Sequence, residues 1–115
     1  MIDEIHEAKV REGEVRIFWL GQNSFVLKTS RNRLVAIDIY LSRDESLHYL
    51  HTEPPMGPED CQFDYVFCTH DHLDHTDPVS LPIIAKSFST AKFFGPSESC
   101  EHMVNLGMDG NRVRR

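Results

Sequence analysis

The sequence has no excess of basic residues, and its only basic cluster is the RVRR stretch at residues 112–115. Its 115 residues include 12 Lys and Arg against 18 Asp and Glu, which gives a net charge of −6 with the histidines neutral. Nucleic acids and anionic membranes attract clustered Lys and Arg. We therefore expect no nucleic-acid partner and no membrane partner.

Long apolar runs and paired cysteines are also absent from the sequence. No stretch approaches the roughly 20 apolar residues that cross a bilayer. The charged start, MIDEIHEAKVREGE, has no apolar segment of the kind found in a signal peptide. Cys61, Cys68 and Cys100 are isolated and form no CxxC pair, which favours a reducing compartment over a disulfide framework. The expected location is the cytoplasm.

The length allows a single domain, residues 1–115, and 40% hydrophobic residues are ordinary for a globular chain. Residues 1–13 predict a short helix that extends ahead of the domain core. Three closely spaced runs, at 14–20, 24–30 and 33–41, predict an antiparallel meander of strands. The third run is the most continuously apolar, as in a strand that is buried on both faces.

The remainder of the chain predicts strands that alternate with helices. Residues 42–62 are polar and proline-containing, and they predict a long loop with a helical turn near Pro58. The order of all elements predicts an α/β layered domain. The later elements are a strand at 63–69, a helix at 77–87 with Asp77 as N-cap, a strand at 91–95, a helix at 96–108 with Ser97 as N-cap, and a further strand beginning at Val113.

One segment, THDHLDHTDP at residues 69–78, gathers three histidines and three aspartates directly after a predicted strand. His70 and His72 are two positions apart, so an extended backbone would point both side chains to one side. Asp74 and His75 follow on a tight turn that can bring them beside the first pair. Imidazoles and carboxylates are ligands of divalent metals, and two adjacent metal sites would explain this density.

Other interpretations of these residues compete with a metal site. A loop rich in His and Asp can be an ordinary solvated turn, and for a single histidine that interpretation is preferred. For four spaced candidates on one strand-to-helix turn, a metal site is the preferred interpretation. Asp71 lies between two candidate ligands and is expected to point away from the metal and to orient the loop. His48 and His51 are spaced for one helical face, but a surface position is the better interpretation for both.

The HDHLDH stretch resembles the HxHxDH motif of the metallo-β-lactamase superfamily, and the similarity extends over residues 14–115. IFWLGQNSFVLKT resembles the entry strands of that fold, and VAIDIYLS resembles the strand whose terminal aspartate, here Asp38, supports the metal loop. FFGPSESCEHMVNLGM resembles the branch that contains L-ascorbate-6-phosphate lactonase. The resemblance implies an αββα sandwich with a mostly antiparallel mixed sheet and flanking helices. This chain would be its N-terminal half, truncated after the second helix.

Carried over by position, the resemblance implies that His70 and His72 bind a first metal ion and that Asp74 and His75 bind a second. Asp74 would also accept the proton of the attacking water. Asp38 would support the loop without binding metal. The two ions would be Mn²⁺ or Zn²⁺, or iron in some members, and they would share a hydroxide that attacks a lactone or related ester. The implied substrate is a small molecule such as a sugar-phosphate lactone.

Superfamily members complete both metal sites with further His and Asp ligands from their C-terminal half. After His75 this sequence offers one histidine, His102, and its place in a predicted helix indicates an exposed side chain rather than a ligand. The alternative to a hydrolase is therefore a truncated, non-catalytic fragment that at most binds metal weakly. A superfamily nuclease is disfavoured by the acidic balance. A sheet without its partner would expose an apolar face, which favours self-association.

Overall fold

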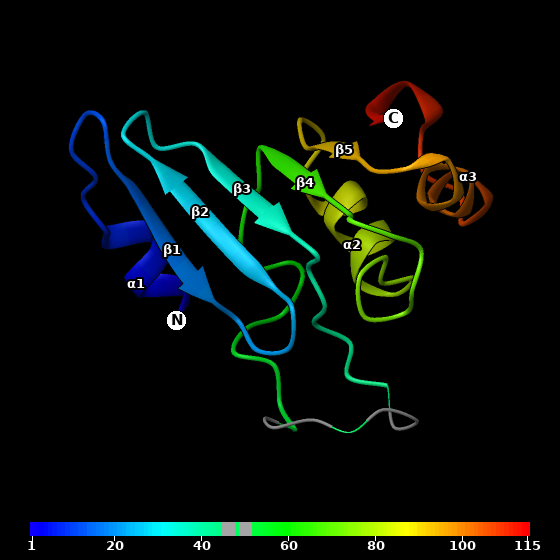
Figure 1. Cartoon of the computed structure of the whole chain (residues 1–115), viewed down its shortest axis with the longest axis horizontal. Coiled ribbons are helices and arrows are strands. Elements are labelled where there is room, and N and C mark those ends of the chain that lie inside the picture. The colour runs from blue at the N-terminus through cyan, green and yellow to red at the C-terminus, as the bar shows by residue number, and fades with distance from the viewer. Residues whose placement is uncertain (45–47, 49–51) are drawn as a thin grey trace.

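The computed structural model describes residues 1–44, 48 and 52–115 and contains a single mixed sheet with helices packed against it. Its strands are neighbours in the order in which they occur in the chain, β1-β2-β3-β4-β5-β6 (Figure 1). The strands are β1 (Val15–Trp19), β2 (Phe25–Thr29), β3 (Leu34–Ile37), β4 (Tyr65–Phe67), β5 (Lys92–Phe94) and β6 (Val113–Arg114). The helices are α1 (Ile2–Glu7), α2 (Ser80–Ser87) and α3 (Ser97–Asn105), followed by the 3₁₀ turn η1 (Gly110–Arg112).

The α/β class and the mixed sheet agree with the prediction, but the balance of strand directions does not. Strands β1, β2 and β3 form the predicted antiparallel meander. The pairs β3–β4, β4–β5 and β5–β6 are all parallel. The expectation of a mostly antiparallel sheet is therefore wrong for the described residues. Two parallel strands need a long connection, because the chain must return to the end of the sheet where the first strand began. The loop after β3 connects β3 to β4, α2 lies between β4 and β5, and α3 lies between β5 and β6.

All three helices contribute to one hydrophobic core. Ile5 of α1, Ile84 of α2 and Met103 of α3 are fully buried in the same cluster. Figure 1 shows α1 near β1 and β2 and shows α2 near β4 and β5. Because side chains alternate along a strand, one row across the sheet faces the helices. This inward row consists of Phe18, Val26, Ala36, Val66, Phe93 and Val113.

The opposite face of the sheet carries large apolar side chains that remain accessible. Ile17 and Trp19 of β1 are 65% and 46% exposed, and Phe67 of β4 is 40% exposed. The rings of Phe67 and Phe94 stack with their centroids 4.8 Å apart. We call this surface the open face and define it by two register rows: Ile17, Leu27, Val35 and Tyr65, and Trp19, Phe25, Ile37, Phe67 and Phe94. The expectation that the third strand is buried on both faces is wrong, since Val35 and Ile37 are only half-buried.

Several predicted boundaries shift for local reasons. The first helix ends at Glu7, and Gly13 adopts a φ of +81° in the turn that leads into β1. Strand β3 ends at Ile37 because the next residue, Asp38, has a φ of +47°, outside the extended region. The segment near Pro58 forms a turn instead of a helix. Within the described residues, no helix has the length and apolarity to cross a membrane.

The starts of the two later helices also differ from the prediction. Helix α2 begins at Ser80, and the residue before it is Val79 rather than Asp77. The Asp77 carboxylate accepts a hydrogen bond from the Val79 amide at 2.9 Å, so it holds the turn that leads into the helix. Helix α3 has Pro96 as its N-cap in place of the predicted Ser97. Gly107 terminates the helix region with a φ of +93°, as its position predicted.

The three cysteines are free thiols in different degrees of burial. Burial raises the pKa of the Cys61 thiol to about 12, and nearby Asp60 adds to this effect. Burial also raises the pKa of Cys68 to about 12. Cys100 is only partly buried, although burial raises its pKa as well. Since the thiolate is the nucleophile, Cys61 and Cys68 should be inert near neutral pH.

Alkylation of the folded chain with iodoacetamide at pH 8 should therefore distinguish the cysteines. A pKa of about 12 leaves a thiolate fraction of about 10⁻⁴ at pH 8, against about 10⁻¹ for a pKa of 9. We expect Cys61 and Cys68 to react far more slowly than Cys100, as measured by peptide mass spectrometry. In urea, all three should react at similar rates. Equal rates in the folded chain would contradict the burial of Cys61 and Cys68.

Candidate metal centre

The candidate site lies where β3 and β4 end at the same edge of the sheet. Parallel strands bring their carboxyl ends together, which is where ligands commonly bind in such folds. Asp38 directly follows β3, and residues 69–76, which we call the histidine loop, follow β4. The loop folds back on itself because the amides of His75 and Thr76 both donate to the His72 carbonyl, at 2.9 and 2.7 Å.

This turn gathers three imidazole rings. The ring centroids of His70 and His75 are 3.8 Å apart, and those of His70 and His72 are 4.3 Å apart. The carboxylate of Asp74 lies beside them, with Oδ1 3.6 Å from Nε2 of His75. The structure thus brings together the four residues that the motif predicted as ligands.

Asp38 anchors the histidine loop to the sheet. Its carboxylate is nearly fully buried and accepts hydrogen bonds from the Thr69 amide and the Thr69 hydroxyl, both at 2.7 Å. Its Oδ2 also lies 2.8 Å from Nδ1 of His75. The Ser24 hydroxyl donates to the Asp38 carbonyl at 2.7 Å, so the residue is held on both its main-chain and side-chain sides.

These contacts determine which ring nitrogens carry protons. An ionised carboxylate only accepts hydrogen bonds, so both the Thr69 hydroxyl and Nδ1 of His75 must donate to Asp38. Nε2 of His75 is then an acceptor, and the Asn23 amide nitrogen lies 3.2 Å from it. Having donated its proton to Asp38, the Thr69 oxygen accepts from Nδ1 of His70 at 2.9 Å. When these rings are neutral, Nε2 of both histidines carries a lone pair, which is the form that binds metal.

His70 and His72 are hydrogen-bonded to each other, and a shared ion would have to replace this contact for both rings to be ligands. Nε2 of His70 lies 3.0 Å from Nδ1 of His72. Two nitrogens bound to one tetrahedral zinc at about 2.0–2.1 Å would lie about 3.3 Å apart. In the described residues, no three His, Cys, Asp or Glu side chains are arranged to hold an ion as they stand. The residue types, imidazole and carboxylate, nevertheless suit a divalent metal.

The remaining candidates lie elsewhere. Asp71 turns away from the imidazoles, and its Oδ1 lies 2.8 Å from Nδ1 of His102 on α3. His48 is exposed, with its carbonyl accepting from the Gln22 side chain, and it does not join the other histidines. His51 lies outside the described residues. His102 is half-exposed on its helix, as expected, but it is paired with the loop.

Residues that the motif did not indicate complete the site. Thr69, Asn23 and Ser24 contact the histidines or Asp38 directly. Thr69 immediately precedes the motif, so its place at the end of a strand was a usable signal. Asn23 and Ser24 lie in the β1–β2 turn, far away in sequence, and no pattern joined them to the loop.

Comparisons with known proteins find similarity to metal-dependent hydrolases. No family model matches the chain. A UPF0173 metal-dependent hydrolase from Polynucleobacter asymbioticus is 29% identical over 101 residues, which are 84% of this chain and 32% of that protein. Another from Anaeromyxobacter dehalogenans is 30% identical over 76 residues, 65% of this chain and 26% of that protein. The chain therefore spans about a third or less of the length of these relatives.

A solved structure has a similar fold. It is described as Igni18, a novel metallo hydrolase from the hyperthermophilic archaeon Ignicoccus hospitalis, and it superposes with a TM-score of 0.58 at 23% identity. The match covers 83% of this chain and 37% of that one. With the curated relatives, it confirms the resemblance to the metallo-β-lactamase superfamily and the α/β class.

The hydrogen-bond logic of the site can be tested at Asp38. In Asp38→Asn, an amide group replaces the carboxylate that accepts hydrogen bonds from Thr69 and His75. We expect a loss of about 1–3 kcal/mol in unfolding free energy and a shift of His75 to the tautomer protonated at Nε2. Long-range ¹H–¹⁵N NMR of the imidazoles reports the tautomer.

Asp71→Asn is the matched control, because Asp71 contacts His102 and not His75. It should leave the His75 tautomer unchanged. If His75 keeps its Nδ1 proton in the Asp38 variant, the proposed direction of these hydrogen bonds is wrong.

Proposed function

We propose that the histidine loop is the metal-binding loop of a metal-dependent hydrolase. The observation that carries this proposal is the buried Asp38 carboxylate, which holds Nδ1 of His75 directly and Nδ1 of His70 through Thr69, so that Nε2 of each neutral ring can bind metal. A solvated surface turn needs no such arrangement. The metal-dependent hydrolases among the relatives support the same conclusion.

The residues divide into ligands and supports. His70 and His72 would hold one divalent ion, and Asp74 and His75 would hold a second. Mn²⁺ or Zn²⁺ suits imidazole and carboxylate donors. When bound, such ions lower the pKa of water and stabilise negative charge that develops on the substrate. Asp38 and Asp71 would hold the loop without binding metal.

Asp74 is the residue that we propose as the proton acceptor. Its side chain is 26% exposed, so water can reach it, and its Oδ1 lies 3.6 Å from the His75 ring. A carboxylate at the edge of the site can take a proton from an attacking water while the neighbouring imidazoles stay deprotonated. A single side chain could thus serve as a ligand and as a base.

The substrate that we propose is a lactone or a related ester, of the sugar-phosphate lactone kind. Its support is the resemblance of residues 93–108 to the lactonase branch; these residues form the end of β5 and α3, beside the histidine loop. A nucleic-acid substrate is disfavoured by the net charge of −6. Arg112 of the one basic cluster donates to the carbonyls of Ala85, Phe88 and Ala91, which occupies it within the fold.

A second candidate function is weak metal binding without catalysis. It is favoured by the absence, within the described residues, of three side chains arranged around one ion. We also propose a reducing compartment, the cytoplasm, because all three cysteines are free thiols.

Metal content is the direct test of the proposed function. The chain purified in the presence of Mn²⁺ or Zn²⁺ should retain about two equivalents by elemental analysis. His70→Ala/His72→Ala should lose about one equivalent, because the first ion loses both imidazoles. His6→Ala/His48→Ala removes two exposed histidines elsewhere and should keep it. Hydrolysis of a lactone and ester panel by the loaded chain would then support the hydrolase, whereas little bound metal in the unsubstituted chain would favour the second candidate.

The open face provides a separate proposal, self-association. Its rows of aliphatic and aromatic side chains form an uncharged centre, so two copies can meet there despite a net charge of −6 on each. Ile17→Asp should shift the chain from dimer to monomer in sedimentation velocity, because it places a charge at the most exposed position of the face. Val79→Asp alters an exposed valine near α2 and should not. A monomer at all concentrations before substitution would rule out self-association.

A further inference from the structure

Helix α3 contacts the histidine loop through two side chains on one helix face. His102 Nδ1 lies 2.8 Å from Asp71 Oδ1, with the two side chains 37% and 31% exposed. Three residues earlier, the Ser99 hydroxyl lies 2.9 Å from the Thr76 hydroxyl, and both residues are fully buried. Residues three apart lie on the same side of a helix, so one face of α3 holds the loop at two points.

Both points are close to the proposed ligands. The Thr76 hydroxyl donates to the His70 carbonyl at 2.8 Å, so Ser99 acts on the backbone of a proposed ligand. Asp71 lies between His70 and His72, so a restraint on its side chain also limits rotation of the backbone on either side. These restraints come from outside the loop and are independent of Asp38.

The helix is seated tightly enough to act as a fixed support. A side chain at Gly95, just before α3, would be crowded: an added Cβ would lie 3.1 Å from Cβ of Ser99 and 3.3 Å from the Cys68 carbonyl oxygen. Met103 on the next turn of the helix is fully buried in the core. Because α3 is fixed against the end of β4 and against the core, it can hold the loop in place.

We propose that Ser99 and His102 are positioning residues of the metal site, an inference that rests on the proposed metal-binding function. His102 fixes Asp71 and thereby sets the directions of His70 and His72. The Thr76 hydroxyl contacts both the Ser99 hydroxyl and the His70 carbonyl, and it thereby joins Ser99 to the backbone of a proposed ligand. Neither residue is a ligand: the ring nitrogen of His102 that faces the loop is already used by Asp71.

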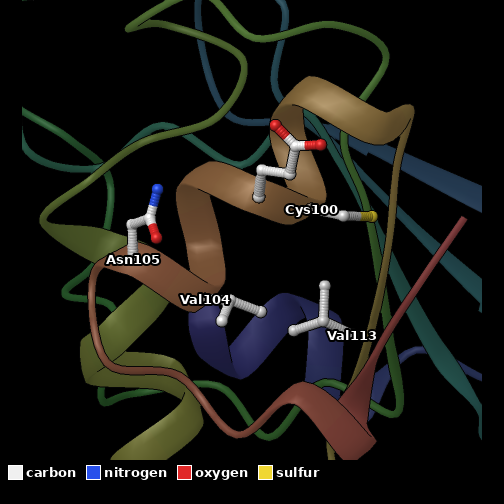
Figure 2. A pocket seen from close by; sticks show the side chains of 5 residues that line it. Cys100, Val104, Asn105 and Val113 are labelled. Atoms are coloured by element: carbon white, nitrogen blue, oxygen red, sulfur yellow. The ribbon is translucent and has the colours of Figure 1, made fainter.

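The other side of α3 provides a matched control. A hollow of about 430 Å³ lies between α3 and the C-terminal strand. Cys100, Val104, Asn105 and Val113 border it (Figure 2). Val104 projects into this hollow and is 45% exposed. A change at Val104 perturbs the same helix two residues from His102, on the side that faces Val113.

The closing experiment measures Co²⁺ binding and amide hydrogen exchange in four versions of the chain: unsubstituted, His102→Ala, His102→Asn and Val104→Ala. The amide nitrogen of asparagine can take the place of Nδ1, so His102→Asn should restore the contact with Asp71. We expect His102→Ala to bind Co²⁺ about fivefold more weakly, as for loss of a partly exposed pair, with an altered visible absorption spectrum. His102→Asn and Val104→Ala should resemble the unsubstituted chain.

Exchange of the His75 and Thr76 amides in the metal-free chain tests the positioning role separately from metal binding. We expect faster exchange at these amides in His102→Ala, with the core amide of Val66 unchanged. An unaltered loop, an effect equal to that of Val104→Ala, or a failure of asparagine to restore the loop would overturn the role of His102. A chain that binds no Co²⁺ but shows the exchange effect would overturn the proposed function and retain the support by α3.

Discussion

The fold around the candidate site depends on one buried carboxylate, that of Asp38. A buried carboxylate is costly unless its oxygens are hydrogen-bonded, and Asp38 receives bonds from Thr69 and His75 while its own amide donates to the Phe67 carbonyl at 2.8 Å. Its φ of +47° is unusual for a residue other than glycine. Such a conformation persists where neighbouring contacts determine it fully. The ends of β3 and β4 and the histidine loop therefore form one structural unit.

A second buried aspartate secures the other end of this region. Asp77 is fully buried, and its carboxylate accepts from the amides of Leu41 and Ser42, both at 3.2 Å. It thereby joins the segment after β3 to the start of α2. The histidine loop lies between these two anchors, with α3 as a lateral support. This explains how a short loop can hold three imidazoles close together although most of its residues are at least partly exposed.

The sequence predicted the parts of this arrangement that depend on local pattern. Alternating apolar residues indicated the meander, and the spacing of His70, His72 and His75 indicated that they would meet. The parallel pairing of β3 with β4 could not be predicted in this way, because it follows a long connection without a recognisable helix. The contact of His102 with Asp71 was also missed. The sequence around a helical histidine does not indicate its partner, because the partner is determined only when the helix packs against the sheet. The packing of α3 depends in turn on the space that Gly95 leaves.

The open face and the candidate site share an edge of the sheet, which links association to chemistry. Ile37 and Phe67 lie in one row of the open face and are the last residues of β3 and β4. Asp38 and the histidine loop follow them in the chain. Any apolar surface that covers this row must therefore approach the imidazoles. Such a cover would exclude water and lower the local dielectric, which strengthens every charge interaction at the site. It could also supply the side chains that the described residues lack around a single ion. The open face and the candidate site are thus linked at this edge of the sheet.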